Sequence, residues 1–220
     1  MLTTNNSIVK KPWGEEYLCF KNNILSIWLL LIKPNSETSL HCHPNKDTGY
    51  VVLDGKVELS FVRGSKKLKT LDKVYIFKKR FHKSKNIDNK ISHILEIESP
   101  IDKNDLIRMN DKYGRAGTPY ESSKNFFKKG SNTLKIKNIT NDKIHVSNYG
   151  KRKLIHFNLF NHKKNISSFK KKDLFIFTSG GFYRGNNILI QPADVMDGSS
   201  LKLFFKNFKL KKNTKVIHVC

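Results

Sequence analysis

Short apolar runs separated by turn signals recur along the whole chain of 220 residues, and this spacing constrains the fold more than any other feature. Runs of about four to eight residues are typical of strands in a small barrel or sandwich. In the first half they lie at 25–32, 50–53, 57–62, 74–77 and 91–97, between turns such as "KPNS" and "LDGK". A short helix is expected only at "KNDLIRMND", residues 103–111. The sequence therefore predicts an all-β chain.

A connector rich in Gly, Ser, Asn and Pro, "KYGRAGTPYESSKNFFKKGSN", divides these runs into two sets. The runs after it are again short and apolar, which predicts a second small barrel or sandwich. They are "KLIHFNLF", "DLFIFTSG", "NNILIQPADV", "LKLFFKNF" and "TKVIHV". We expect two domains, 1–122 and 123–220.

The cysteines and the apolar content bound the class of protein. Cys19, Cys42 and Cys220 are odd in number and far apart, so neither a disulfide framework nor a cysteine zinc site is indicated. The longest apolar run, "ILSIWLLLI", is much shorter than the roughly 20 residues of a membrane helix, and the first residues hold no apolar leader segment. A cytoplasmic protein without a membrane span is the expectation.

The formal charge of +24 raises the question of a polyanionic partner. Lysine is spread over the whole chain, however, with +10 in residues 1–130 and +14 in 131–220, and no nucleic-acid motif is visible. Nucleic-acid binding is therefore not expected. Attraction of small phosphorylated or carboxylated ligands is the favoured interpretation of the charge.

Two histidines one residue apart, His41 and His43 in "SLHCHPN", give the first sign of a functional site. In a strand, alternate side chains share a face, so these two imidazoles point the same way and Cys42 points the other. A third histidine, His82, follows the predicted strand that ends at Phe77. Imidazole nitrogens are usual ligands of zinc, iron, manganese and nickel, so the pattern indicates a divalent metal site.

The spacing of His41, His43 and Gly55, followed by His82 and Asn86, resembles the two motifs of the cupins, whose histidines hold a metal inside a small jelly-roll barrel. The chain departs from those motifs at four positions. Asn35, Phe77 and Lys79 stand where the motifs have Gly, Pro and Gly, and Thr48 stands where they have a metal-binding Glu. The resemblance implies a cupin-type barrel in the first half. The second half has no His-x-His pair and no partner histidine at a matching spacing, so we expect a bicupin whose second barrel is degenerate and free of metal.

A narrower resemblance covers residues 10 to about 121, most clearly in "EIESPIDKNDLIRMNDKYGR". This part is similar to the cupin domain of type II mannose-6-phosphate isomerases, which is also fused to mannose-1-phosphate guanylyltransferases. The resemblance implies a barrel that binds a sugar phosphate beside a metal and interconverts an aldose and a ketose. It also implies metal-binding roles for His43 and His82 and places Glu96 as a strand carboxylate.

The fourth metal ligand and the groups around the substrate are open at this point. Water, Glu37 or Asp47 are the alternatives for the place left by Thr48. Glu96 is the candidate catalytic base, because it lies on one strand face with Glu98. The candidates for binding phosphate are Lys46, Arg80, Lys83, Arg108 and Arg115, with arginine favoured for its bidentate fork.

The expected function is a metal-binding cupin that acts on a phosphorylated sugar or sugar nucleotide in carbohydrate or surface-polysaccharide metabolism, as an isomerase or epimerase. A mannose-6-phosphate isomerase-like enzyme is the specific form of this hypothesis. Two alternatives stay open: a non-catalytic sugar-phosphate-binding or regulatory module, and a three-histidine dioxygenase of a small molecule. The oligomeric state is also open, with a homodimer as one option.

Overall fold

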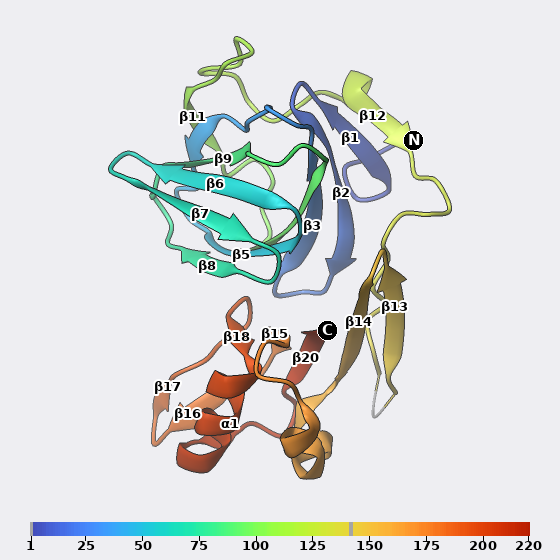
Figure 1. Cartoon of the computed structure of the whole chain (residues 1–220), viewed down its shortest axis with the longest axis vertical. Helices are drawn as coiled ribbons and strands as arrows, with labels where there is room; N and C mark the ends of the chain where they lie inside the picture. The colour runs from blue at the N-terminus through green and yellow to red at the C-terminus, as the bar shows by residue number, and fades with distance from the viewer. Residues whose placement is uncertain (1, 141–142) are drawn as a thin grey trace. The chain divides into compact units, whose positions relative to one another are not determined.

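The computed structural model describes residues 2–140 and 143–220, and it divides the chain into two compact units (Figure 1). The first consists of Met1–Cys19 and Ser26–Thr133, and the second of Phe20–Leu25 and Leu134–Cys220. The predicted domains were 1–122 and 123–220, with residues 1, 141 and 142 outside the described part. The first unit continues past residue 122 because β12 (Phe126–Lys128) pairs with β1 (Ser7–Lys11).

Both units are built mainly from antiparallel strands, which confirms the all-β fold class. In the first unit a seven-stranded sheet has the order β12-β1-β2-β3-β10-β5-β8, and a five-stranded sheet has the order β11-β4-β9-β6-β7. The remaining bounds are β2 Gly14–Lys21, β3 Ser26–Ile32, β4 Leu40–Cys42, β5 Asp47–Asp54, β6 Lys56–Phe61, β7 Ser65–Lys69, β8 Lys73–Ile76, β9 His82–Asn86, β10 Ser92–Ser99, β11 Ile107–Asn110 and the 3-10 turn η1 Ser123–Asn125.

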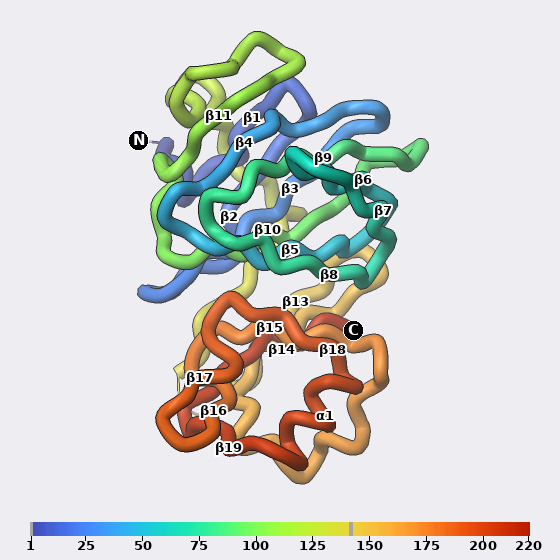
Figure 2. Tube along the Cα trace, turned by 90° about the vertical axis from the view of Figure 1, so that its left-hand side faces the viewer, coloured from blue at the N-terminus to red at the C-terminus, as the bar shows by residue number. Residues whose placement is uncertain are grey.

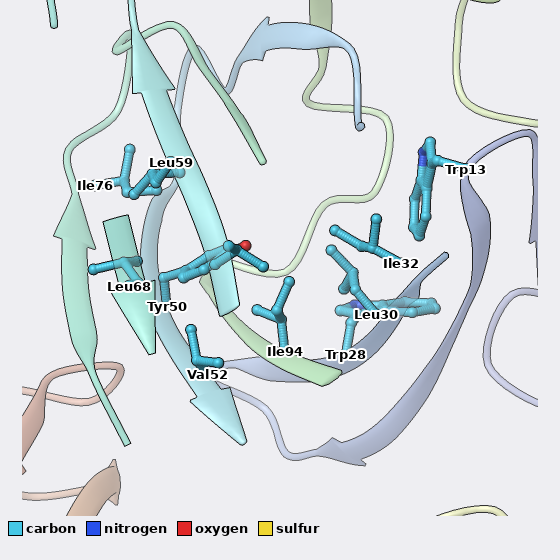
Figure 3. Close-up of a cluster of buried hydrophobic side chains, with 11 residues drawn as sticks. Trp13, Trp28, Leu30, Ile32, Tyr50, Val52, Leu59, Leu68, Ile76 and Ile94 are labelled. Carbon is cyan, nitrogen blue, oxygen red and sulfur yellow. The ribbon is translucent and has the colours of Figure 1, made fainter. Parts of the chain in front are cut away.

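The two sheets of the first unit enclose a buried apolar cluster, which Figure 3 shows between the strands. The side chains of Trp28, Tyr50 and Ile94 come from β3, β5 and β10 and lie together in its centre. The Tyr50 hydroxyl donates a hydrogen bond to Ser84 Oγ at 2.7 Å, so this buried polar group is satisfied. Burial of this cluster stabilises the barrel.

Two residues that stand in place of cupin-motif glycines adopt the backbone conformation that favours glycine. Asn35 has φ 57° and Lys79 has φ 65°. Asparagine tolerates this region well, whereas lysine pays a steric cost of about 1 kcal/mol. The Lys79 main-chain N–H donates to the His43 carbonyl at 2.7 Å, and this bond stabilises the strained turn. The motif geometry is thus retained although the glycines are lost.

The second unit contains a five-stranded sheet of order β13-β14-β20-β15-β18 and a three-stranded sheet of order β17-β16-β19. Three predicted strands are confirmed as β14, β15 and β20, whereas "NNILIQPADV" yields two short strands, β17 and β18. The bounds are β13 His145–Tyr149, β14 Arg152–Asn158, η2 (a 3-10 segment) Leu159–Ser168, β15 Leu174–Ser179, β16 Phe182–Arg184, β17 Asn187–Ile188, β18 Val195–Asp197, β19 Lys209–Leu210 and β20 Lys215–Val219.

Two secondary-structure predictions are wrong. The expected helix at 103–111 is a loop followed by strand β11, because Ile107–Asn110 pairs with β4 and this tertiary pairing outweighs local propensity. The expected strand "LKLFFKNF" lies in helix α1 (Gly198–Asn207), whose N-cap Asp197 accepts a hydrogen bond from Ser200 N at 2.8 Å. Its residues Leu201, Phe204 and Phe205 belong to the core of the second unit or pack against it.

No helix in the described residues is long and apolar enough to cross a membrane. Figure 2 shows α1 as a short coil within the second unit. This finding agrees with the absence of a long apolar run in the sequence.

Gly55, in the turn between β5 and β6, is expected to be intolerant of substitution. It has φ +94°, and an added Cβ would lie 2.6 Å from Ser92 Oγ and 3.0 Å from Ser92 Cα. Gly64 has a similar φ of +82° but open space around an added Cβ. We expect Gly64→Ala to cost about 1 kcal/mol of unfolding free energy and Gly55→Ala about 1–3 kcal/mol more, measured by urea denaturation. Equal losses of unfolding free energy in the two variants would show that the contact between the added Cβ and Ser92 has no energetic cost.

Candidate metal centre

The β4–β9 pairing brings the three sequence-predicted histidines together. His41 on β4 is the direct partner of His82 on β9, and His43 follows β4 by one residue. The ring centroids of His41 and His82 are 4.5 Å apart, those of His41 and His43 5.1 Å, and those of His43 and His82 5.6 Å. The shared face expected for His41 and His43 is therefore present, while their role as metal ligands stays a prediction.

Each of these imidazoles is held through Nδ1 by a main-chain carbonyl. The acceptors are Ser39 O at 2.8 Å from His41, Asp105 O at 2.7 Å from His43, and Arg80 O at 2.9 Å from His82. A carbonyl oxygen only accepts, so Nδ1 carries the proton and Nε2 keeps a lone pair. A metal-binding histidine is usually oriented in this way, with its other ring nitrogen bonded to a carbonyl or carboxylate oxygen.

The Nε2 atoms of His43 and His82 are buried and have no hydrogen-bond partner among the described residues. Unpaired buried polar atoms are costly, so two of them facing the same cluster indicate a group that the protein normally binds there. Burial lowers the pKa of all three imidazoles, to about 3 for His43 and about 4 for His82. Neutral imidazoles with free Nε2 lone pairs fit a divalent metal.

Glu96 on β10 adds a carboxylate to the three histidines. One oxygen of Glu96 and one nitrogen of each histidine all lie within 4.8 Å of one another. Ligand atoms at roughly 2.1 Å from a shared zinc ion lie up to about 4 Å apart, so a small contraction would suffice for metal binding. Burial, followed by the charge of Glu98, raises the pKa of Glu96. Without a cation, this carboxylate is thus poorly stabilised as an anion.

The alternatives considered for the place of Thr48 are engaged elsewhere. Glu37 forms an ion pair with Lys83 at 3.0 Å, and Asp47 Oδ1 accepts a hydrogen bond from the Lys78 main-chain N–H at 2.8 Å. Thr48 itself is buried, and its hydroxyl has no partner among the described residues. Among the carboxylates of the described residues, Glu96 is the one that groups with the three histidines.

A network of lysines and carboxylates surrounds this cluster. Lys46 Nζ donates to Glu98 Oε1 at 2.7 Å, and Lys103 Nζ lies 3.5 Å from Glu98, 3.3 Å from Glu16 and 4.0 Å from Glu96. Burial alone would raise the pKa of Glu98, but Lys103 and Lys46 outweigh it and lower that pKa. Lys103 also lies over the Trp28 ring, 4.0 Å from its centroid. The charges near the histidines are thus internally compensated.

A pocket with about 530 Å³ of empty space, part of it open to solvent, leads to the cluster. Three of the predicted substrate-binding residues, Lys46, Arg108 and Arg115, line it. Arg80 is exposed and lies over the Phe61 ring, away from the pocket lining. Residues of the lining that the sequence did not single out include Lys11, Glu16, Lys103 and Tyr120.

In the second unit, His156 of "HFNLFNH" has both ring nitrogens in hydrogen bonds. Nδ1 meets Lys137 O at 2.9 Å, and Nε2 meets Thr178 Oγ1 at 3.1 Å. His162 donates from Nδ1 to Asn158 O at 2.9 Å. These bonds give both residues structural roles, and the absence of a metal in the second unit stays a prediction.

A closed pair of antiparallel sheets with inward histidines from neighbouring strands defines the class: the first unit is a cupin barrel with a candidate metal site. Residues 2–111 match the family model described as "Mannose-6-phosphate isomerase C-terminal". The match spans half of the 220 residues, and the chain belongs to this family.

One curated relative is the alginate biosynthesis protein AlgA of Pseudomonas putida, which is 26% identical over 121 residues. The match covers 54% of this chain but 25% of AlgA, so the chain spans about a quarter of that protein.

Two solved structures are also similar. KdgF of Halomonas sp. has a TM-score of 0.40 and 15% identity, with 42% of this chain and 84% of KdgF covered. A protein with a double-stranded β-helix domain from Klebsiella pneumoniae has a TM-score of 0.41 and 19% identity, with 47% and 91% covered. Because both TM-scores are low, the fold assignment rests on the strand order and pairing within this chain and not on these two structures.

Removal of one histidine is expected to abolish metal retention. We expect wild-type protein supplied with zinc, iron, manganese or nickel to keep roughly one metal per chain after dialysis against a mild chelator, and His82→Ala to keep almost none. Elemental analysis measures both. His93→Ala is the matched control, because His93 lies on β10 outside the cluster. Metal that survives His82→Ala, or that is lost equally in His93→Ala, would contradict the assignment.

Proposed function

We propose that the first unit binds one divalent metal through His41, His43 and His82 and acts on a phosphorylated sugar or sugar nucleotide as an isomerase or epimerase. The observation that carries this proposal is the convergence of three neutral imidazoles and Glu96 in the lining of one pocket. Membership of the mannose-6-phosphate isomerase C-terminal family supports the substrate class. The name of the alginate biosynthesis relative supports a place in polysaccharide metabolism.

The bound metal would supply a Lewis acid that polarises a sugar carbonyl. Glu96 is the group that we assign to proton transfer between neighbouring carbons, because its carboxylate belongs to the cluster and also lines the pocket. The adjacent pair Glu98 and Lys46 is held by a 2.7 Å ion pair and keeps the strand end in place. The reaction class is therefore proton abstraction from a carbon next to a carbonyl, with Glu96 on β10 as the base.

The rest of the pocket suits a small polar molecule with an apolar face. Trp13 and Leu30 contribute apolar walls, and Thr38, Ser39 and Ser84 contribute hydroxyl groups. A few polar groups on largely preformed walls are the usual composition of a small-ligand site. Because Lys11, Arg108 and Arg115 also line the pocket, an anionic substituent such as phosphate would find cations there.

A hexose phosphate is expected to stabilise the protein more than the free hexose does. A ligand that binds the native state raises the melting temperature in proportion to the logarithm of its concentration over its Kd. We expect mannose 6-phosphate, fructose 6-phosphate or glucose 6-phosphate to shift Tm in the metal-loaded protein, and equal concentrations of the free hexoses to shift it much less. Equal shifts would remove the phosphate from the proposal.

Glu96→Gln is expected to separate proton transfer from metal binding. In the proposal the three histidines hold the metal, and the amide keeps an oxygen near them but carries no titratable proton. We therefore expect turnover to fall about 100-fold or more while metal content is kept. An aldose–ketose interconversion assay and elemental analysis on the same preparation measure the two quantities. Glu37→Gln is the control, because that carboxylate pairs with Lys83. A wild-type protein that binds hexose phosphate without any turnover would instead be a binding or regulatory module.

A further inference from the structure

The segment 113–121, here called the strap, runs between β11 and β12 and lies beyond the residues that match the family. Figure 1 shows it as the yellow-green chain at one end of the barrel. Most of its residues are exposed, yet Arg115 and Tyr120 line the pocket and the Glu121 side chain is only 6% exposed. The strap thus sends charged and polar side chains inward.

Three pocket-lining cations meet on the carboxylate of Glu121. Arg115 donates to Glu121 Oε1 at 2.6 Å and Arg108 to the same oxygen at 3.2 Å, while Lys11 donates to Oε2. Both oxygens of one carboxylate are therefore held by cationic donors from three different parts of the chain. Such a convergence of charge-assisted donors is the arrangement that binds a phosphoryl group.

Further bonds fasten the strap near this carboxylate. Arg108 also donates to the carbonyls of Thr118 and Pro119, and the Tyr120 hydroxyl donates to Glu16 Oε1. Arg115 is held on its other side by Asp111, at 2.7 Å. Arg108 and Arg115 are thus paired with carboxylates of the same chain, although the proposed function requires a cation for phosphate.

Two glycines of the strap have a positive φ and open surroundings. Gly114 has φ +78° and Gly117 has φ +71°, and nothing lies within 4 Å of a Cβ built on either. Glycine adopts this conformation without steric cost, and the open surroundings leave room for the backbone to turn. We expect the strap backbone to turn at these two glycines when Glu121 leaves Lys11.

We propose that Lys11, Arg108 and Arg115 form the binding site for the phosphoryl group of the ligand and that Glu121 occupies this site until the ligand displaces it. This inference rests on the proposed function for the nature of the ligand. A phosphoryl group carries about two negative charges and three acceptor oxygens, against one charge and two oxygens for Glu121, so it makes the stronger set of bonds. A ligand without an anionic group leaves the carboxylate in place.

Glu121 is a competitor on the same chain, so its effective concentration at the site is high and lowers the apparent affinity for phosphate. Removal of its charge should expose that hidden affinity. We expect Glu121→Gln to tighten the Kd of inorganic phosphate about tenfold or more relative to wild type, measured by calorimetry at fixed ionic strength on the full chain. Glu37→Gln removes a carboxylate from the Lys83 ion pair and should leave this Kd unchanged.

Two further measurements separate this site from general electrostatic attraction. The gain in Glu121→Gln should disappear when Lys11→Met is added, because Lys11 binds Glu121 Oε2. In wild type, phosphate should speed hydrogen exchange of the strap amides, since displacement of Glu121 frees the segment. A structural Glu121 would give no gain in affinity, a lower Tm and unchanged or slower exchange, and would overturn the inference.

The outcome also distinguishes this inference from the proposed function. If mannose 6-phosphate stabilises wild type more than mannose does and Glu121→Gln leaves phosphate affinity unchanged, the inference falls and the proposed function stands. If neither wild type nor Glu121→Gln binds phosphate or a hexose phosphate, phosphate recognition is rejected in both the inference and the proposed function. A gain in phosphate affinity in a protein that shows no isomerisation supports the inference and rejects the enzyme.

Discussion

The hydrogen bonds from three imidazole Nδ1 atoms to main-chain carbonyls determine the rest of the site. Each bond fixes a tautomer and a ring orientation, and together they point three lone pairs into one volume. The carbonyls belong to Ser39, Arg80 and Asp105, which lie in three separate loops. Asp105 also accepts from the main chain of Asn45 and Lys46 through its carboxylate, so one residue orients His43 and ties two loops together. The loops therefore orient the histidine side chains, and the sheets stabilise the barrel that holds them.

The pocket around the histidines is nearly balanced in charge although the chain as a whole carries +24. Lys46 and Lys103 face Glu98, and Arg108, Arg115 and Lys11 face Glu121. Buried charges are stable only when they are paired. The buried cations of the pocket therefore have carboxylate partners, although acidic residues are scarce in the chain as a whole. The lysine surplus lies mainly on the surface and says little about the chemistry inside.

The sequence predicted the features that depend on short periods and fixed spacings. Alternation placed His41 and His43 on one face, and the spacing to His82 predicted the third histidine of the cluster. Contacts between distant segments gave no local signal: Lys11 and Glu121 are 110 residues apart and meet only because β1 and the strap adjoin in the fold. Helix α1 was missed for another reason, since its apolar run looks like a strand and its start is marked only by Asp197 and the small residues after it.

The pairing of β12 with β1 has a consequence for the timing of events at the pocket. The strap belongs to the connection between β11 and β12, and both strands are paired with other strands of the first unit. The two ends of this connection are therefore fixed, which limits how far the strap can move. Glu121 that leaves its three cations stays close to them, so its return is a first-order step whose rate is independent of protein concentration. Loop motions of this length fall in the nanosecond to microsecond range. Exchange between the tethered carboxylate and a diffusing anion would then be limited by the arrival and departure of the anion, and the barrel would respond to its ligand without a slow conformational phase.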